Sequence, residues 1–131
     1  MVTPAYRGFP RTARLTRPAD FTRVYGRRQS AASGQLVVYA LPNGLPDGRV
    51  RLGLSVSRRI GTAVVRNRWK RRLREAFRLV RTDLPPGIDV IIVVRTGEPP
   101  CGAAGLRQTA ASIASLVARV TGRPGFPGVE G

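Results

Sequence analysis

The sequence predicts a single α+β domain built around one mixed β-sheet. Three observations support this fold class: a length of 131 residues, apolar residues at helical spacing in three segments, and short β-branched runs between those segments. A chain of this length can bury one modest hydrophobic core. The expected order of elements is α-β-β-β-α-β-α, or the same order with one strand fewer if residues 35–57 form two strands rather than three.

The first helix is expected to begin near Pro18, because proline suits the first position of a helix. The residues that follow on one helical face are Phe21, Val24, Tyr25 and Arg28. Residues 30–34 are expected to end this helix. Residues 1–16 before it are basic and contain prolines, which predicts a flexible cationic arm.

Two β-strands are expected in residues 35–41 and 49–57, which are rich in β-branched and alternating apolar residues. Residues 42–48 between them contain the prolines and glycines of a turn, so the two strands are expected to form a hairpin. A third run, residues 88–95, contains six β-branched apolar residues. It is expected to be a central strand that is buried on both faces.

The second helix is expected after Thr62, which can cap it, and Pro85 stops it. At about 100° per residue, its apolar side chains fall within one arc of roughly 120°. These are Val65, Trp69, Leu73, Ala76, Phe77 and Val80. The rest of the circumference is mostly basic, so one face is expected to pack and the other to bind. A last helix is expected from about Ala103, followed by a disordered Gly/Pro-rich tail at residues 122–131.

The composition indicates a polyanionic partner. Twenty-three Lys and Arg residues against seven Asp and Glu give a formal charge of +16, so self-repulsion opposes folding unless an anion is bound. Only Lys70 is a lysine, and arginine suits bidentate phosphate contacts and stacking on bases. Genomic base composition explains the same arginine excess equally well. Charge therefore indicates nucleic acid without saying which one.

The residue inventory argues against a protein catalyst that works alone. The chain has no His, and its seven carboxylates are scattered along the sequence without the clustering that a metal-dependent nuclease needs. The single Cys101 excludes a disulfide framework and a thiolate metal cluster. We therefore expect no catalytic residue, no metal site and no cofactor held by protein side chains. No apolar run is long enough for a membrane span, and no signal peptide is recognisable, so the expected location is the cytoplasm.

Cations cluster at the expected start of the second helix, where each opposes the helix dipole by about 0.3–1 kcal/mol. They are Arg58, Arg59, Arg66 and Arg68. A bound phosphate reverses this effect, because it accepts from the first-turn N–H groups and from the guanidinium groups. The side chain of Asn67 could hydrogen-bond with a base edge, with a 2′-OH or with its own backbone. For a single asparagine, the local backbone role is the default interpretation. A merely solvated basic face is the weaker interpretation of the whole helix.

A second candidate surface combines three aromatic residues with nearby arginines, as single-stranded RNA recognition requires. The aromatic residues are Phe21, Tyr25 and Tyr39, and the arginines are Arg17, Arg23, Arg28 and Arg51. Simple core packing is the competing interpretation, and for Phe21 the two are evenly matched.

Residues 55–78, which read SVSRRIGTAVVRNRWKRRLREAFR, resemble the most characteristic block of one family, the protein subunit of bacterial ribonuclease P. The block includes the Arg-Asn-Arg motif of that family at residues 66–68. Weaker similarity extends over about residues 14–120. The chain departs from the family pattern with arginine where many members have lysine, with Trp69 where a smaller aliphatic residue is usual, and with its Gly/Pro-rich tail.

The resemblance implies a left-handed β-α-β crossover and three parts: an arm (1–16), a domain (17–121) and a tail (122–131). It implies a subunit that binds the catalytic RNA and the 5′ leader of precursor tRNA, while the RNA subunit performs the Mg²⁺-dependent cleavage that removes the leader. The residues implied to bind the RNA subunit are Arg58, Arg59, Arg66, Asn67, Arg68, Lys70, Arg71 and Arg74. The residues implied to bind the leader are Phe21, Tyr25, Tyr39, Arg17 and Arg28.

Three other functions remain open from the residues alone. A structural RNA-binding protein of the ribosomal kind would share the charge and the fold class. A DNA-binding module would place the basic helix in a major groove, although its cations cover more of the circumference than one groove edge needs. A membrane-surface helix would require the flanking strands to unfold. No membrane and no obligate protein partner is expected.

Overall fold

The computed structural model describes residues 14–124 and 126, and its elements follow the predicted order α-β-β-β-α-β-α. The helices are α1 (Pro18–Gly26), α2 (Ala63–Val80) and α3 (Gly102–Thr121). The strands are β1 (Ser30–Ser33), β2 (Leu36–Pro42), β3 (Arg51–Ser55) and β4 (Ile88–Val94). Two short 3₁₀ helices, η3 (Arg58–Ile60) and η4 (Arg81–Asp83), flank α2. The predicted α+β class with one mixed sheet is confirmed.

The predicted hairpin between residues 35–41 and 49–57 is wrong. The strand order is β1-β2-β4-β3, so β4 lies between β2, to which it is antiparallel, and β3, to which it is parallel. Alternating apolar residues predict a strand but not its neighbour. Because β4 is the most apolar strand and is buried on both faces as predicted, it takes the central position and pairs with both others.

The first strand, β1, comes from a segment that was not predicted to be a strand. Residues 30–34 were expected to end the first helix, yet α1 ends at Gly26, and Ser30–Ser33 form a hairpin with β2. Gly34, at the turn, has a φ of +57°, which glycine adopts without strain. Since the segment SAAS carries no β-branched residue, only its pairing with β2 makes it a strand.

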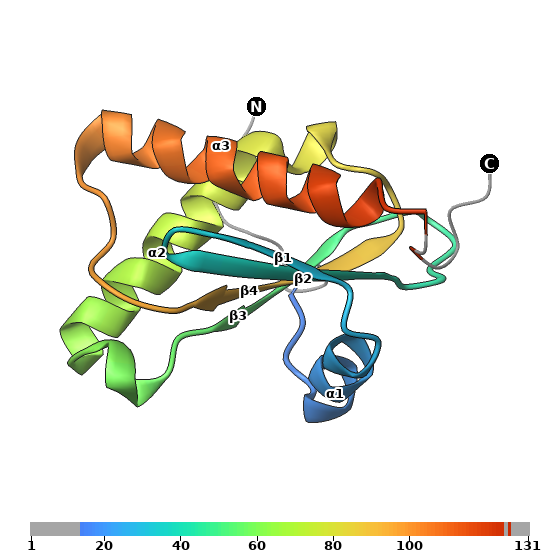
Figure 1. Ribbon diagram of the computed structural model, residues 1–131, viewed down its shortest axis with the longest axis horizontal. Helices are drawn as coiled ribbons and strands as arrows, with labels where there is room; N and C mark the ends of the chain where they lie inside the picture. Colours follow the sequence, from blue (N-terminus) through green and yellow to red (C-terminus); the bar gives the residue numbers. More distant parts are fainter. Residues whose placement is uncertain (1–13, 125, 127–131) are drawn as a thin grey trace.

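The sheet has helices on both faces (Figure 1). Helices α2 and α3 cover one face and α1 covers part of the other. The main core lies under α2 and α3, and it contains the predicted packing arc of α2, with Trp69, Leu73, Ala76 and Phe77 buried. A smaller core under α1 contains Leu15, Val24, Leu41 and Ile91. Burial of each large apolar side chain contributes about 1.5–3 kcal/mol.

At both ends of the described chain, residues that were predicted to belong to the arm or the tail pack on the domain. Leu15, expected in the flexible arm, is only 4% exposed, and its N–H donates to the carbonyl oxygen of Leu52 at 2.8 Å. Phe126, expected in the tail, is also 4% exposed and packs on the main core. The rest of the predicted arm, residues 1–13, and residues 125 and 127–131 of the predicted tail lie outside the described residues.

Candidate nucleic-acid interface

The start of α2 is built as the sequence predicts. Thr62 is the N-cap residue, and its Oγ1 accepts a hydrogen bond from the N–H of Val65 at 3.3 Å. A Cβ atom on Gly61 would lie 3.1 Å from the Cβ of Val65, so glycine allows η3 to approach the first turn closely. Arg66 is partly buried, and its Nε donates to the carbonyl oxygen of Gly61 at 3.3 Å.

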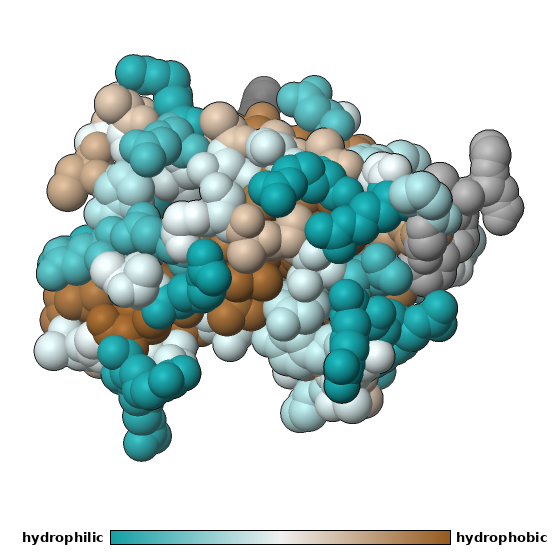
Figure 2. Space-filling view, in the orientation of Figure 1, coloured by the Kyte–Doolittle hydropathy of each residue, from teal (hydrophilic) through white to brown (hydrophobic). Residues whose placement is uncertain are grey.

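We define the basic face as the eight residues of η3 and α2 that the resemblance implies for RNA binding. They are Arg58, Arg59, Arg66, Asn67, Arg68, Lys70, Arg71 and Arg74. Five of them are exposed, and Arg66, Lys70 and Arg74 are partly buried. Figure 2 shows hydrophilic side chains above and below an apolar patch near the start of α2, at lower left, and around α1, below the sheet.

Few fixed interactions neutralise the cations of the basic face among the described residues. Arg68 forms an ion pair with Glu98 at 3.6 Å, but both side chains are more than half exposed, so this pair contributes little to stability. Burial lowers the pKa of Arg74, and the nearby charge of Arg14 lowers that pKa further. An anion bound beside these arginines would relieve their mutual repulsion.

We define the aromatic platform as Phe21, Tyr25 and Tyr39, all of which are partly buried. The ring of Tyr25 lies edge-on to that of Tyr39, with centroids 4.8 Å apart, and 6.2 Å from the ring of Phe21. Burial raises the pKa of Tyr25, and the nearby side chain of Ser55 partly offsets this rise. The structure therefore brings together all three aromatic residues predicted for the leader.

Phe21 serves mainly as packing within this group. A Cβ atom on Gly53 would lie 2.8 Å from the Cζ of Phe21 and 3.1 Å from the Cβ of Leu15, so the phenyl ring sits directly on the glycine of β3. On its other side, Phe21 lies 6.2 Å from the ring of Tyr25. Of the two interpretations weighed for Phe21, core packing is the better description of its position.

The arginines predicted beside the platform separate into two groups. Arg17 is the N-cap residue of α1, and Arg28 follows the other end of the same helix, where its φ is +55°. Both are exposed, and α1 lies between them. Arg23 and Arg51 are not left for RNA, because both hydrogen-bond with the buried Asp89.

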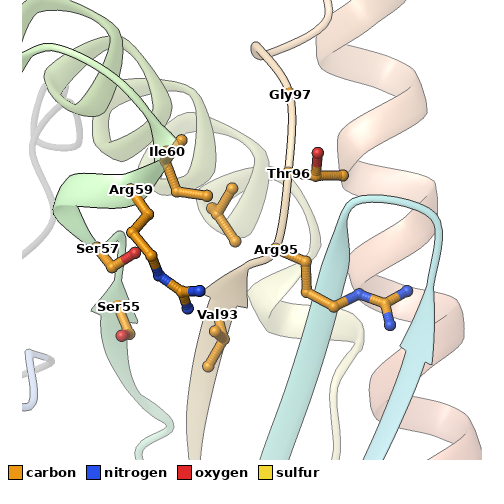
Figure 3. Close-up of a pocket in the computed structure, with 9 residues that line it drawn as sticks. Ser55, Ser57, Arg59, Ile60, Val93, Arg95, Thr96 and Gly97 are labelled. Carbon is orange, nitrogen blue, oxygen red and sulfur yellow. The ribbon is translucent and has the colours of Figure 1, made fainter.

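A cleft of about 700 Å³ lies between η3 and the end of β4 (Figure 3). Its lining residues are Ser55, Ser57, Arg59, Ile60, Val93, Val94, Arg95, Thr96 and Gly97. Figure 3 shows the Arg59 guanidinium extending toward Val93 at the end of β4. The side chain of Ser55 lies close to the Tyr25 hydroxyl, and Val93 packs on the smaller core under α1. The cleft therefore continues from the basic face to the aromatic platform.

Sequence reasoning missed two cationic contributions to this surface. Arg95, in the cleft, follows the predicted central strand, and its guanidinium donates to the carbonyl oxygen of Gly34 at 2.8 Å. Arg72 lines a second groove of about 250 Å³ with Arg68 and Arg71, beside the first residues of α3. Helical spacing already places Arg72 on the basic side of the helix, although it is not among the residues implied to bind RNA, whereas nothing in the sequence places Arg95 beside this cleft.

The described residues offer little else that would indicate another chemistry. Within residues 14–124 and 126, no three His, Cys, Asp or Glu side chains converge as a metal-binding group would. In the same part of the chain, every helix is too short or too polar to cross a membrane.

Comparisons with known proteins agree with this geometry. Residues 9–120 match the profile of the ribonuclease P family. A ribonuclease P protein component of Desulfovibrio desulfuricans is 38% identical over 125 residues, which cover 93% of this chain and 94% of that protein. A second, from Caldanaerobacter subterraneus, is 45% identical over 82 residues, or 63% of this chain and 69% of the other.

Solved structures give the same result. The RNase P protein of Thermotoga maritima superposes with a TM-score of 0.67 at 26% identity, covering 90% of this chain and 98% of that one. The Staphylococcus aureus RNase P protein gives a TM-score of 0.60 at 32% identity, covering 84% and 93%. Since the family match spans most of the sequence and the fold agrees with these structures, the chain belongs to the ribonuclease P protein family and is a subunit of a tRNA-processing endoribonuclease.

Proposed function

We propose that this chain binds the catalytic RNA of ribonuclease P through its basic face and holds the 5′ leader of precursor tRNA on its aromatic platform. The observation that carries the proposal is the cleft that joins the two surfaces, with Arg59 at one side and Ser55, which lies close to Tyr25, at the other. A strand of RNA lying in this cleft would meet cations at one end and aromatic rings at the other.

The basic face suits an RNA backbone because its cations are exposed or only partly buried, and the one ion pair that they form among the described residues, Arg68 with Glu98, is exposed and 3.6 Å long. Guanidinium groups form bidentate hydrogen bonds with phosphate, and each neutralised phosphate releases counterions. Cations of the protein would also reduce the Mg²⁺ that the RNA subunit needs for folding and cleavage. We propose that the protein side chains hold no metal ion themselves and act by placing substrate and catalytic RNA together.

The aromatic platform suits the leader because its rings are held in place before RNA arrives. Stacking of one base on such a ring contributes about 1–3 kcal/mol and accepts any base. Arg17 and Arg28, at the two ends of α1, would then contact backbone phosphates on either side. The partners required are the catalytic RNA and precursor tRNA, and the site of action that follows is the cytoplasm.

The test is cleavage of a precursor tRNA by the cognate catalytic RNA at low Mg²⁺, with and without this protein. We expect strong stimulation by the protein and no cleavage by the protein alone. If the RNA is active at high Mg²⁺ but the protein gives no stimulation, the proposal fails. The structural RNA-binding function would then be tested by identifying the RNA that co-purifies with the chain.

A further inference from the structure

A buried carboxylate lies between α1 and the sheet, where Arg23 of α1 contacts it. Asp89 is in the central strand β4, and its side chain is 0% exposed although the strand is otherwise apolar. A carboxylate is costly to bury unless cations and hydrogen-bond donors surround it. In a sequence with seven acidic residues and a charge of +16, the use of one of them here calls for an explanation.

Side chains from three parts of the fold donate hydrogen bonds to the Asp89 carboxylate. Arg51, on β3, donates from Nε to Oδ1 and from a terminal nitrogen to Oδ2, both at 2.8 Å. Asn43, after β2, donates to Oδ1 at 3.1 Å. Arg23, on α1, donates to Oδ2 and also to the carbonyl oxygen of Pro42, the latter at 3.1 Å. The carboxylate therefore connects α1 to the middle of the sheet.

The connection continues back to α1 through Arg51, which lies 3.9 Å from Asp20. Asp20 and Arg23 are three residues apart, so they share one face of the helix. Asp20, Arg51, Asp89 and Arg23 thus form a chain of alternating charges that begins and ends on α1, which we call the ion-pair chain. These residues come from α1, β3 and β4, which lie far apart in the sequence, and only the fold brings the three elements together.

Helix α1 needs such a connection. It has nine residues, too few to be stable alone, and Val24 is the residue it buries completely. Phe21 and Tyr25 share one side of the helix, and Arg23 projects from nearly the opposite side. A rotation or shift of α1 would separate Tyr25 from Tyr39, whose rings now lie 4.8 Å apart.

We propose that Asp89 is a positioning residue for the leader: acting through Arg23 and Arg51, it holds α1 so that Tyr25 and Tyr39 present a fixed stacking surface. This inference rests on the proposed function of the aromatic platform. The carboxylate touches no RNA itself, and its burial keeps its negative charge away from the phosphates. Substitution should weaken recognition of the leader and leave binding of the catalytic RNA intact.

The test compares Asp89→Asn with Asp47→Asn in the reconstituted holoenzyme. Asp47 pairs with Arg49 on the surface at 2.9 Å, in the loop between β2 and β3, so its variant makes the same charge change elsewhere. We expect Asp89→Asn to weaken binding of precursor tRNA about tenfold, the loss of one stacked base. Mature tRNA binding, catalytic RNA binding and kcat at saturating substrate should stay unchanged. Asp47→Asn should alter none of these.

A second pair of variants covers the case in which Asp89→Asn does not fold. Arg23→Gln should reduce the preference for precursor over mature tRNA, and Arg23→Lys, which keeps the charge, should restore part of it. Arg27→Gln removes an exposed cation from the end of the same helix and serves as the control. Equal losses of precursor and mature tRNA binding, or no loss in folded Asp89 and Arg23 variants, would overturn the inference.

Tyr39→Ala, measured in parallel, separates this inference from the proposed function. If Tyr39→Ala leaves leader recognition unchanged, the aromatic platform does not bind the leader, and the proposed function fails there. If Tyr39→Ala reduces recognition of the leader but the Asp89 and Arg23 variants do not, the platform binds the leader and the proposed positioning role of Asp89 is wrong.

Discussion

The basic face and the aromatic platform adjoin the same cleft, yet their side chains are held in opposite ways. On the basic face, five of eight side chains are exposed, and the ion pair of Arg68 with Glu98 is long. On the platform, every ring is partly buried, Tyr25 touches both other rings, and α1 is tied to the sheet by the ion-pair chain.

The difference reflects what each surface is proposed to bind. Phosphate groups repeat along an RNA backbone, so mobile cations can find them and the number of charges matters most. A base stacks only on a ring whose plane is already fixed, because ordering the ring at the moment of binding would cost conformational entropy. Variants of the two surfaces should therefore fail in different ways.

The largest expected effect is on the basic face. The double variant Arg66→Ala with Arg68→Ala should bind the catalytic RNA about 100-fold more weakly, since each charge-assisted hydrogen bond contributes about 1.5–3 kcal/mol. The slope of log K against log salt should become shallower by about 1.5. Filter binding over a salt series measures both quantities.

The matched control for this variant is Arg107→Ala with Arg119→Ala, two exposed positions on α3. It removes the same charge from another surface and should cause a much smaller loss. Unchanged RNA binding by a folded Arg66/Arg68 double variant would remove the motif from the proposed interface.

The next largest effect concerns the platform. Tyr39→Ala should reduce the preference for precursor over mature tRNA about tenfold, because one stacked base contributes about 1–3 kcal/mol. Tyr39→Phe keeps the ring and should retain the preference. Phe21→Ala should reduce it too, with a loss of thermal stability, because its ring packs on Gly53. Equal weakening for both tRNAs would indicate that the rings act only in packing.

A smaller effect tests whether the two faces of α2 are separable. Trp69 is 1% exposed, and its indole N–H donates to the carbonyl oxygen of Gly97 at 2.9 Å. Trp69→Phe should lower the free energy of unfolding by about 1–2 kcal/mol through the lost hydrogen bond and the smaller ring. Denaturant titration measures this change. RNA affinity should remain within about twofold; a larger loss would show that the packing face also controls binding.

The smallest effect is expected at the exposed ion pair. Glu98→Gln should change the free energy of unfolding by less than about 0.5 kcal/mol, because the pair with Arg68 is exposed and 3.6 Å long. RNA binding should become slightly tighter as Arg68 is released. Asp83→Asn, an exposed position at the other end of α2, gives the same charge change and should have less effect on RNA binding. Weaker binding by Glu98→Gln would indicate that Glu98 orients Arg68 for RNA.

Local patterns predicted the elements well and their partners poorly. The packing arc of α2 follows from helical spacing alone, and the burial of β4 follows from its unbroken β-branched run. The hairpin prediction failed because the alternating apolar residues of β3 can pack equally well beside any apolar strand, so they do not specify β2 as the partner. The strand at residues 30–33 escaped notice because its stability comes from pairing with β2.

In the candidate site, too, the features set by local sequence could be predicted and those set by packing could not. The basic face could be predicted because its residues are contiguous and its cations recur along one helix. The cleft could not, because η3, which carries Arg59, and the end of β4 lie side by side only through the parallel pairing of β3 with β4. The acidic residues that look scattered in the sequence include Asp20 and Asp89, which the fold places around the same arginine.

The sequence by itself determined what depends on neighbours within a few residues: the positive charge, the two faces of α2, the family motif at residues 66–68 and the order of elements. The tertiary structure alone decided which strands are adjacent, where the cleft lies and which arginines are paired with Asp89. The physical reason is that helical and strand periodicities arise from local backbone geometry, whereas strand partners and buried ion pairs are chosen by competition among all segments during packing.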